Sequence, residues 1–177
     1  MSIVDKRYAE ALFRIALQEN AINTYQEELV AVSGLYETNG EFRNFLLYPQ
    51  YDGKLKKQVL NTLFEHELGK NMLNFLMLLL DKNRITLLPT ISREFVRLAD
   101  EHNRVLNITI FAAIPMEAED VKKVCDKFQA LYHASDVKAT VELDSSLIGG
   151  IKVAVGDKLY DASIKGRLSE LLSAMSV

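Results

Sequence analysis

The spacing of apolar residues changes abruptly at Val105, and this change constrains the fold more than any other feature of the chain. From Ile3 to His102 the apolar residues recur every three or four positions, a pattern typical of amphipathic helices. From Val105 they alternate with polar residues in VLNITI, as in a strand with one solvent-exposed face. We therefore expect a helical part followed by a mixed part, joined near residue 105.

The helical part divides into six predicted helices. Its interruptions are Asn20, Gly40, Pro49, Gly69 and the pair Asn83 and Arg84. Asp52 is placed to cap the fourth helix, and Pro89 is tolerated in the first turn of the sixth. Residues 1–104 are thus predicted to form a six-helix bundle.

The mixed part predicts strands near residues 105–110, 137–143, 151–155 and 159–160, with a helix from Ala118 to Tyr132 and a turn at Gly156 and Asp157. A C-terminal helix is expected from Ser163 to Met175. The predicted class is mainly α with a small α+β part. A six-helix bundle over 1–104 is followed, over 105–177, by a small β-α-β-β unit and that C-terminal helix.

Composition places the chain among ordinary globular proteins. Of its 177 residues 49% are hydrophobic and 25% charged, the net charge is −3, and neither half is basic enough to suggest a nucleic-acid footprint. The only cysteine, Cys125, is expected to be a buried, reduced thiol. The first residues carry charges where a signal peptide needs an apolar core, so we expect no leader.

The familiar catalytic patterns fail on spacing. Gly150 and Gly156 enclose five residues, whereas a phosphate loop needs four followed by Gly-Lys-Ser/Thr. The segment HELGK at His66 lacks the second histidine of a zinc protease helix, and His102 and His133 lie far from it. We therefore expect no enzyme, no metal and no cofactor.

One alternative function stays open on these residues. Some RNA-binding modules share the β-α-β-β order, so the second part could serve as a small RNA-binding adaptor. The predicted sheet lacks the paired aromatic residues that such modules stack on bases. Its helix offsets Lys122, Lys123 and Lys127 with neighbouring acidic residues.

Two helices carry more apolar surface than a small bundle can bury. In the first, the apolar stripe is extended sideways by further apolar residues, although a surface helix needs an apolar arc of only about 100°. In the fifth, residues 72–80 are apolar on every side, which also fits a central helix wrapped by the other five. We expect a groove for an amphipathic partner helix between them. Its candidate residues are Tyr8, Ala11, Leu12, Ile15, Phe75, Leu78 and Leu79.

The predicted C-terminal helix offers a third apolar stripe. Its residues are Ile164, Leu168, Leu171, Leu172 and Met175. Packing back on the sheet and binding to a partner are equally compatible with this pattern.

Three stretches resemble one protein family. DSSLIGGIKVAVGDKLYDASIKGRLSELL is similar to the signature of the delta subunit of F-type ATP synthase, the oligomycin-sensitivity-conferring protein family. RYAEALFRIA resembles that family's opening helix, and DKNRITLLPTISREF its passage from fifth to sixth helix. The signature residues are Leu147, Ile148, Gly149, Gly150, Gly156, Asp157, Tyr160, Asp161, Gly166 and Arg167. Ala162 and Lys165 depart from it, where many relatives place Gly and Arg.

The resemblance implies a stator, or peripheral-stalk, subunit without catalytic residues. Such a protein tethers the catalytic alpha/beta head to the stalk, so that rotor torque is coupled to proton-driven ATP synthesis. The bundle would bind the N-terminal helix of an alpha subunit through the candidate groove residues. The C-terminal stripe would bind the C-terminal ends of the b subunits, and the glycines would shape a docking platform. A place on the cytoplasmic face of a bacterial cell membrane, attached only through the complex, is implied.

Overall fold

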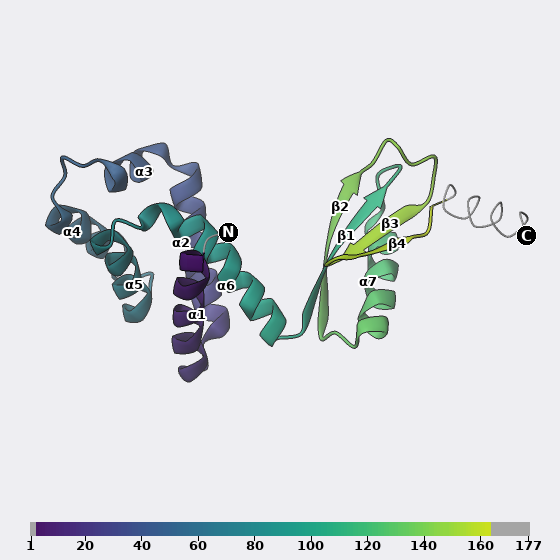
Figure 1. Cartoon of the computed structure of the whole chain (residues 1–177), viewed down its shortest axis with the longest axis horizontal. Helices are drawn as coiled ribbons and strands as arrows, with labels where there is room; N and C mark the ends of the chain where they lie inside the picture. The colour runs from purple at the N-terminus through teal and green to yellow at the C-terminus, as the bar shows by residue number, and fades with distance from the viewer. Residues whose placement is uncertain (1–2, 164–177) are drawn as a thin grey trace, which may run out of the picture. The chain divides into compact units, whose positions relative to one another are not determined.

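The computed structural model describes residues 3–163 and divides the chain into two compact units, Met1–Ala99 and Asp100–Val177 (Figure 1). This division falls inside the last helix of the bundle, five residues before the predicted boundary. The predicted C-terminal helix lies outside the described residues. So do the predicted stalk-binding residues Ile164, Leu168, Leu171, Leu172 and Met175, and the signature residues Gly166 and Arg167.

The helical part contains the six α-helices that the sequence predicts. They are α1 (Ile3–Gln18), α2 (Ile22–Thr38), α3 (Gly40–Leu47), α4 (Gly53–Phe64), α5 (Lys70–Asp81) and α6 (Leu88–His102). A short 3₁₀ turn, η1 (Ile85–Leu87), precedes α6 and was not predicted. The mainly helical class with a small sheet is confirmed.

Local chemistry explains where these helices begin. The side chains of Asn39 and Asp52 accept hydrogen bonds from the first-turn N–H groups of α3 and α4, as N-cap residues do. Pro89 is the second residue of α6, where its missing N–H is tolerated. Asn20 and Asn83 adopt positive φ just after α1 and α5, a conformation that asparagine accepts more readily than most residues.

The bundle closes on one core to which every helix contributes. Its buried members include Leu12, Leu29, Leu46, Leu60, Leu76 and Phe95. Phe13 of α1 meets Phe95 of α6 edge to face, with ring centroids 5.7 Å apart. Glu94 is a buried carboxyl on α6, and Arg97 donates to both of its oxygens at 2.9 and 3.0 Å. That pairing offsets the penalty of burying a charge.

The second unit is a four-stranded sheet with one helix on it. Its elements are β1 (Val105–Ala112), α7 (Ala118–Tyr132), β2 (Asp136–Leu143), β3 (Ile151–Val155) and β4 (Lys158–Asp161). The strand order is β2-β1-β3-β4, with β1 parallel to β2 and the other pairs antiparallel. The short fourth strand pairs with β3, so the unit is β-α-β-β with one further strand.

Helix α7 covers one face of this sheet and forms a small core with it (Figure 1). The buried residues of that core are Ile108, Ile110, Phe128, Val153 and Val155. Cys125 packs against this core but is only half-buried, which corrects the expectation of a buried thiol. The reason is its place at the edge of the helix face that meets the sheet. Burial still raises the pKa of the thiol.

The glycine-rich stretch supplies backbone geometry that other residues adopt with strain. Gly150 has φ +81°, and a Cβ added there would lie 2.7 Å from the carbonyl oxygen of Ala162. Gly156 has φ +56° in the β3–β4 turn, where nothing crowds it. Tyr160 then packs edge to face on Phe128, and its hydroxyl lies 2.7 Å from that of Tyr132. The stretch therefore fixes β4 against the end of β3 and under α7.

Candidate protein-binding site

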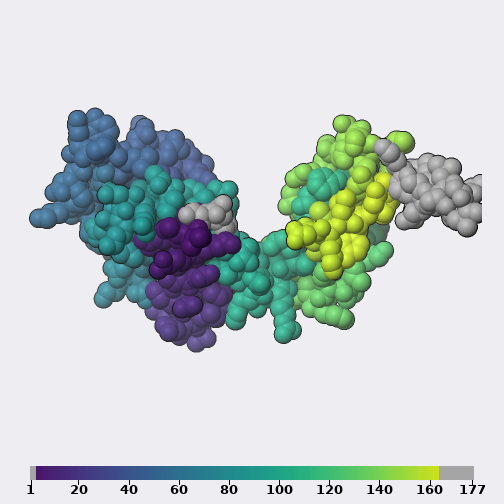
Figure 2. All heavy atoms as spheres, viewed as in Figure 1, coloured from purple at the N-terminus to yellow at the C-terminus, as the bar shows by residue number. Residues whose placement is uncertain are grey.

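Helices α1 and α5 lie side by side in opposite directions and are tied at both ends. At one end Asn71 Nδ2 donates to Glu19 Oε1 at 2.6 Å, joining the start of α5 to the end of α1. At the other end Arg84 Nη1 donates to the Tyr8 hydroxyl at 2.9 Å. In Figure 2 the purple helix α1 lies on the near face of the first unit. These two hydrogen bonds join residues that are 52 and 76 positions apart in the sequence, and they hold the two helices together.

Between these helices the surface forms a hollow of about 410 Å³, which we call the α1–α5 hollow. The residues that line it are Val4, Arg7, Tyr8, Ala11, Leu12, Ile15, Phe75, Leu78 and Arg84. Six of the seven predicted groove residues are among them. Leu79, the seventh, points into the core and is 0% exposed.

The lining separates into a buried floor and an exposed rim. Leu12 is 1% exposed and Phe75 is also buried, so both belong to the floor. Ile15 and Leu78 are 39% and 43% exposed, and Ala11 is exposed as well. Half-buried Tyr8 stands against Phe75 edge to face, with centroids 6.3 Å apart. The rim is what a partner would touch, and the floor holds the rim in place.

Two arginines complete the lining, and sequence reasoning did not select them. Arg7 is one of the charged residues of the first helix, and Arg84 belongs to a break between two predicted helices. A signal for Arg7 was available, because it lies three positions after Val4 and four before Ala11 and so borders the apolar stripe. No local signal pointed to Arg84, which reaches Tyr8 only through the fold of the bundle.

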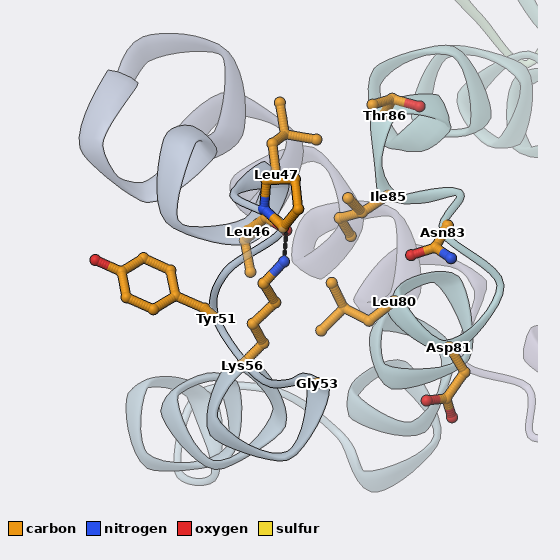
Figure 3. A pocket seen from close by; sticks show the side chains of 11 residues that line it. Leu46, Leu47, Tyr51, Gly53, Lys56, Leu80, Asp81, Asn83, Ile85 and Thr86 are labelled. Atoms are coloured by element: carbon orange, nitrogen blue, oxygen red, sulfur yellow. Dashed lines mark hydrogen bonds between the residues drawn. The ribbon is translucent and has the colours of Figure 1, made fainter.

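A second hollow of about 450 Å³ lies elsewhere on the first unit, between α3, the start of α4 and the end of α5 (Figure 3). None of the predicted site residues lines it. Lys56 Nζ donates to the Leu46 carbonyl at 2.7 Å, which satisfies the C-terminal end of α3. Lys57 pairs with Asp81 at 2.6 Å on its edge. These polar ties are explained by the packing of the bundle alone.

The second unit exposes apolar residues of its own. Ile148 is 77% exposed, and with Ile114, Met116, Val124 and Gly150 it lines a hollow of about 540 Å³. Ser163 is the last described residue of this unit. The predicted stalk-binding stripe begins one residue later, so its contacts stay a prediction.

The RNA-binding alternative receives no support from the sheet. Two of its lysines are already paired, Lys138 with Asp100 at 2.7 Å and Lys152 with Asp161 at 3.8 Å. Strand alternation puts Tyr160 under α7 with Phe128, away from the uncovered face. A stacking platform for bases needs paired aromatic residues on that open face.

Metal-binding clusters and membrane-spanning helices are both absent from residues 3–163. Within that range no group of three or more histidine, cysteine, aspartate or glutamate side chains is arranged to hold a metal ion. The same residues contain no helix that is both long and apolar enough to cross a membrane. The α1–α5 hollow, with its apolar rim and two cations, brings together six of the seven predicted groove residues and is the candidate site.

Comparison with known proteins gives a consistent result. The family model described as "ATP synthase delta (OSCP) subunit" matches residues 4–175. The ATP synthase subunit delta of Acetivibrio thermocellus is 42% identical over 99% of this chain and 98% of its own length. That of Ruminiclostridium cellulolyticum is 39% identical over the full length of both chains.

Solved structures share the fold at lower identity. A chain of the Toxoplasma gondii mitochondrial ATP synthase hexamer has a TM-score of 0.69 at 21% identity and covers 100% of this chain and 99% of its own. A chain of the Polytomella F-ATP synthase, refined with the F1 head and rotor, has a TM-score of 0.53 at 17% identity. It covers 58% of this chain and 90% of its own.

Proposed function

Because this chain belongs to the ATP synthase delta (OSCP) subunit family, we propose that it is a non-catalytic stator subunit of F-type ATP synthase. In this role it tethers the catalytic head to the peripheral stalk, so that the head does not turn with the rotor. Torque is then converted into ATP synthesis rather than lost as rotation of the head.

The observation that carries the proposal is the apolar rim of the α1–α5 hollow. Tyr8, Ala11, Ile15 and Leu78 present side chains to solvent along two helices that other contacts hold in place. An amphipathic helix laid between them would cover these groups, as in other helix-in-groove complexes. We assign this surface to the N-terminal helix of an alpha subunit, which would link the protein to the alpha/beta head.

The apolar rim supplies only part of the affinity that a tether needs. Full burial of a large apolar side chain is worth about 1.5 to 3 kcal/mol. Ile15 and Leu78 are only 39% and 43% exposed, so the rim residues together gain roughly 2 to 4 kcal/mol when a partner covers them. Association costs at least about 4 kcal/mol in lost freedom of motion, so one helix on the rim binds weakly unless it makes additional contacts. A stator also gains from being held at two places at once, because linked sites raise the overall affinity.

The second attachment is assigned to the C-terminal part of the chain. There the stripe of Ile164, Leu168, Leu171, Leu172 and Met175 would contact the C-terminal ends of the b subunits. The protein would then sit at the cytoplasmic face of a bacterial membrane without touching lipid, held there only through the complex.

The test uses the full-length protein and a synthetic peptide covering the N-terminal helix of the alpha subunit from the same organism. Calorimetry should give binding to the wild type that Leu78→Glu and Ile15→Glu each weaken by well over tenfold, because a charge then faces the apolar side of the peptide. Leu12 and Leu79 are unsuitable for this test because both lie in the core.

Leu63→Glu is the matched control. Leu63 is 50% exposed on α4, similar to Leu78, but does not line the α1–α5 hollow. Circular dichroism should show that all three variants keep their helices. Unchanged binding in both hollow variants would show that the head is held elsewhere.

A further inference from the structure

We propose that Arg7 and Arg84 make the α1–α5 hollow selective for a helix that carries carboxylates at the Tyr8 end. This inference rests on the proposed function, because it concerns the partner of the same site. Apolar contacts alone would not distinguish the charge of a bound helix or the direction in which it lies. The two arginines would select both.

The first observation is the unequal charge of the two ends of the hollow. At the Tyr8 end the lining includes Arg7 and Arg84, and among the described residues that line the hollow none is acidic. Arg7 and Arg84 are the charged residues among the described residues that line the hollow, so its opposite end is lined by uncharged side chains. A docked helix therefore meets positive charge at the Tyr8 end alone.

The second observation is that Arg84 is held ready. Its Nη1 donates to the Tyr8 hydroxyl at 2.9 Å, and its guanidinium carbon lies 5.5 Å from the centroid of the same ring. Two contacts with one aromatic side chain restrain a flexible residue before any partner arrives. A guanidinium has five N–H donors, so this geometry leaves donors that a carboxylate can engage.

The third observation is that nearby acids do not neutralise this end. Asp81, the last residue of α5, lies three positions before Arg84 in the sequence. Its carboxylate is engaged by Lys57 at 2.6 Å. Glu10 lies three positions after Arg7 on α1, but no ion pair between the two is found among the described residues. Arg7 is itself exposed, so its charge is accessible to a partner.

Charge complementarity of this kind acts on the choice of partner and on the rate of association more than on total affinity. A carboxylate lying between the two guanidinium groups gains hydrogen bonds stronger than those between neutral groups. A lysine at the same place is repelled. Apolar anchors at Ile15 and Leu78 would hold either helix, so the arginines decide which helix stays and which way it points.

The experiment is a double-mutant cycle with the full-length protein and two probes. One probe is the alpha-subunit N-terminal peptide, and the other is the same peptide with its Asp and Glu residues replaced by Asn and Gln. Wild type, Arg7→Gln and Arg84→Gln are titrated with each in a calorimeter at two salt concentrations. Each arginine variant should bind the acidic peptide about threefold to tenfold more weakly.

The wild type should bind the amide peptide more weakly than the acidic peptide, by a similar factor. For the arginine variants the difference in affinity between the two peptides should be smaller, because the mutation and the peptide change remove the same interaction. The wild-type affinity for the acidic peptide should also fall more steeply with salt than that of either variant. Arg14→Gln, on the exposed side of α1 and outside the lining, should match the wild type.

Tyr8→Phe separates charge from positioning. This variant removes the hydroxyl that accepts from Arg84 but keeps the ring and the cation, so it should retain the preference for the acidic peptide. Equal affinity of the wild type for both peptides, or wild-type affinity in both arginine variants, would overturn this inference alone. Absence of binding by either peptide would remove the proposed function and this inference with it.

Discussion

The two units of the chain differ in how completely they bury their apolar side chains. In the first unit all six helices contribute to one continuous core, and its exposed apolar side chains at the α1–α5 hollow rest on that core. In the second unit the core is small, and Ile114, Leu143 and Ile148 are each more than 60% exposed. A bundle buries helix faces from all round, whereas one helix covers only one face of a sheet. The first unit therefore depends on packing, and the second more on turn geometry.

The largest expected effect is a loss of stability when a core residue of the bundle is truncated. Leu78 and Leu79, adjacent on α5, test it. Leu79→Ala should lower the free energy of unfolding by about 2 to 5 kcal/mol, because it opens a cavity in the bundle core. Leu78→Ala should lower it by less than about 1 kcal/mol, because that side chain is already partly in water. Urea denaturation of both variants measures the difference. Equal losses would mean that the rim of the hollow is part of the core.

A smaller effect is expected from the turn geometry of the second unit. Gly150→Ala should cost about 1 to 3 kcal/mol for its positive φ, and more because the new Cβ would strike the backbone at Ala162. Gly156→Ala is the matched control, since it also has positive φ but open space around it, and should cost only about 1 kcal/mol. Thermal melting monitored on the sheet compares the two. If Gly150→Ala were the milder change, the close approach of β4 would not stabilise this unit.

The smallest effect concerns pH. Hydrogen bonds from Arg97 hold the pKa of Glu94 below its ordinary value of 4.5, so the folded state favours the ionised carboxylate, and Lys6 adds to this. The resulting stability is present above about pH 4.5 and is lost as pH falls through the lowered pKa. Glu94→Gln should cost about 1 kcal/mol at neutral pH, a modest value because the Arg97 side chain is half exposed.

That difference from the wild type should shrink as the solution is made more acid than pH 4.5. Denaturant titrations at several pH values would measure it, with the exposed Glu37→Gln as a control that changes little. In the second unit the pKa of Asp161 is lowered by a hydrogen bond from Ser163, but this carboxyl is exposed, so Asp161→Asn should cost less. A constant difference between wild type and Glu94→Gln across pH would show that the ion pair is not its source.

Much of the fold could be predicted because it follows from local patterns. Helical spacing before Val105 and alternation after it identified each α-helix and strand of residues 3–163, and Asp52 was recognised as a cap. The family predicted from the stretch that contains Gly149 and Gly150 is confirmed by the match over residues 4–175. The exceptions were the 3₁₀ turn at Ile85–Leu87 and the partial exposure of Cys125, which depend on how elements meet.

The candidate site could be predicted only in part. Surplus apolar surface on the first and fifth helices selected Tyr8, Ile15 and Leu78, which the structure brings to one hollow. The same reasoning selected Leu79, which faces the core, because a helix that is apolar all round does not reveal which side is covered. It did not select Arg84, because that residue lies 76 positions from the hydroxyl it contacts.

The sequence by itself determined which segments are α-helix and strand, and it indicated that the first and fifth helices are unusually rich in apolar residues. Hydrophobic periodicity, helix caps and turn residues act over only a few positions, so they can be recognised in the sequence without knowledge of the fold. Only the tertiary structure decided which of those apolar residues form the floor and which the rim, and that two cations stand at one end. Those properties arise from contacts between segments distant in the chain, and such contacts exist only once the helices pack together.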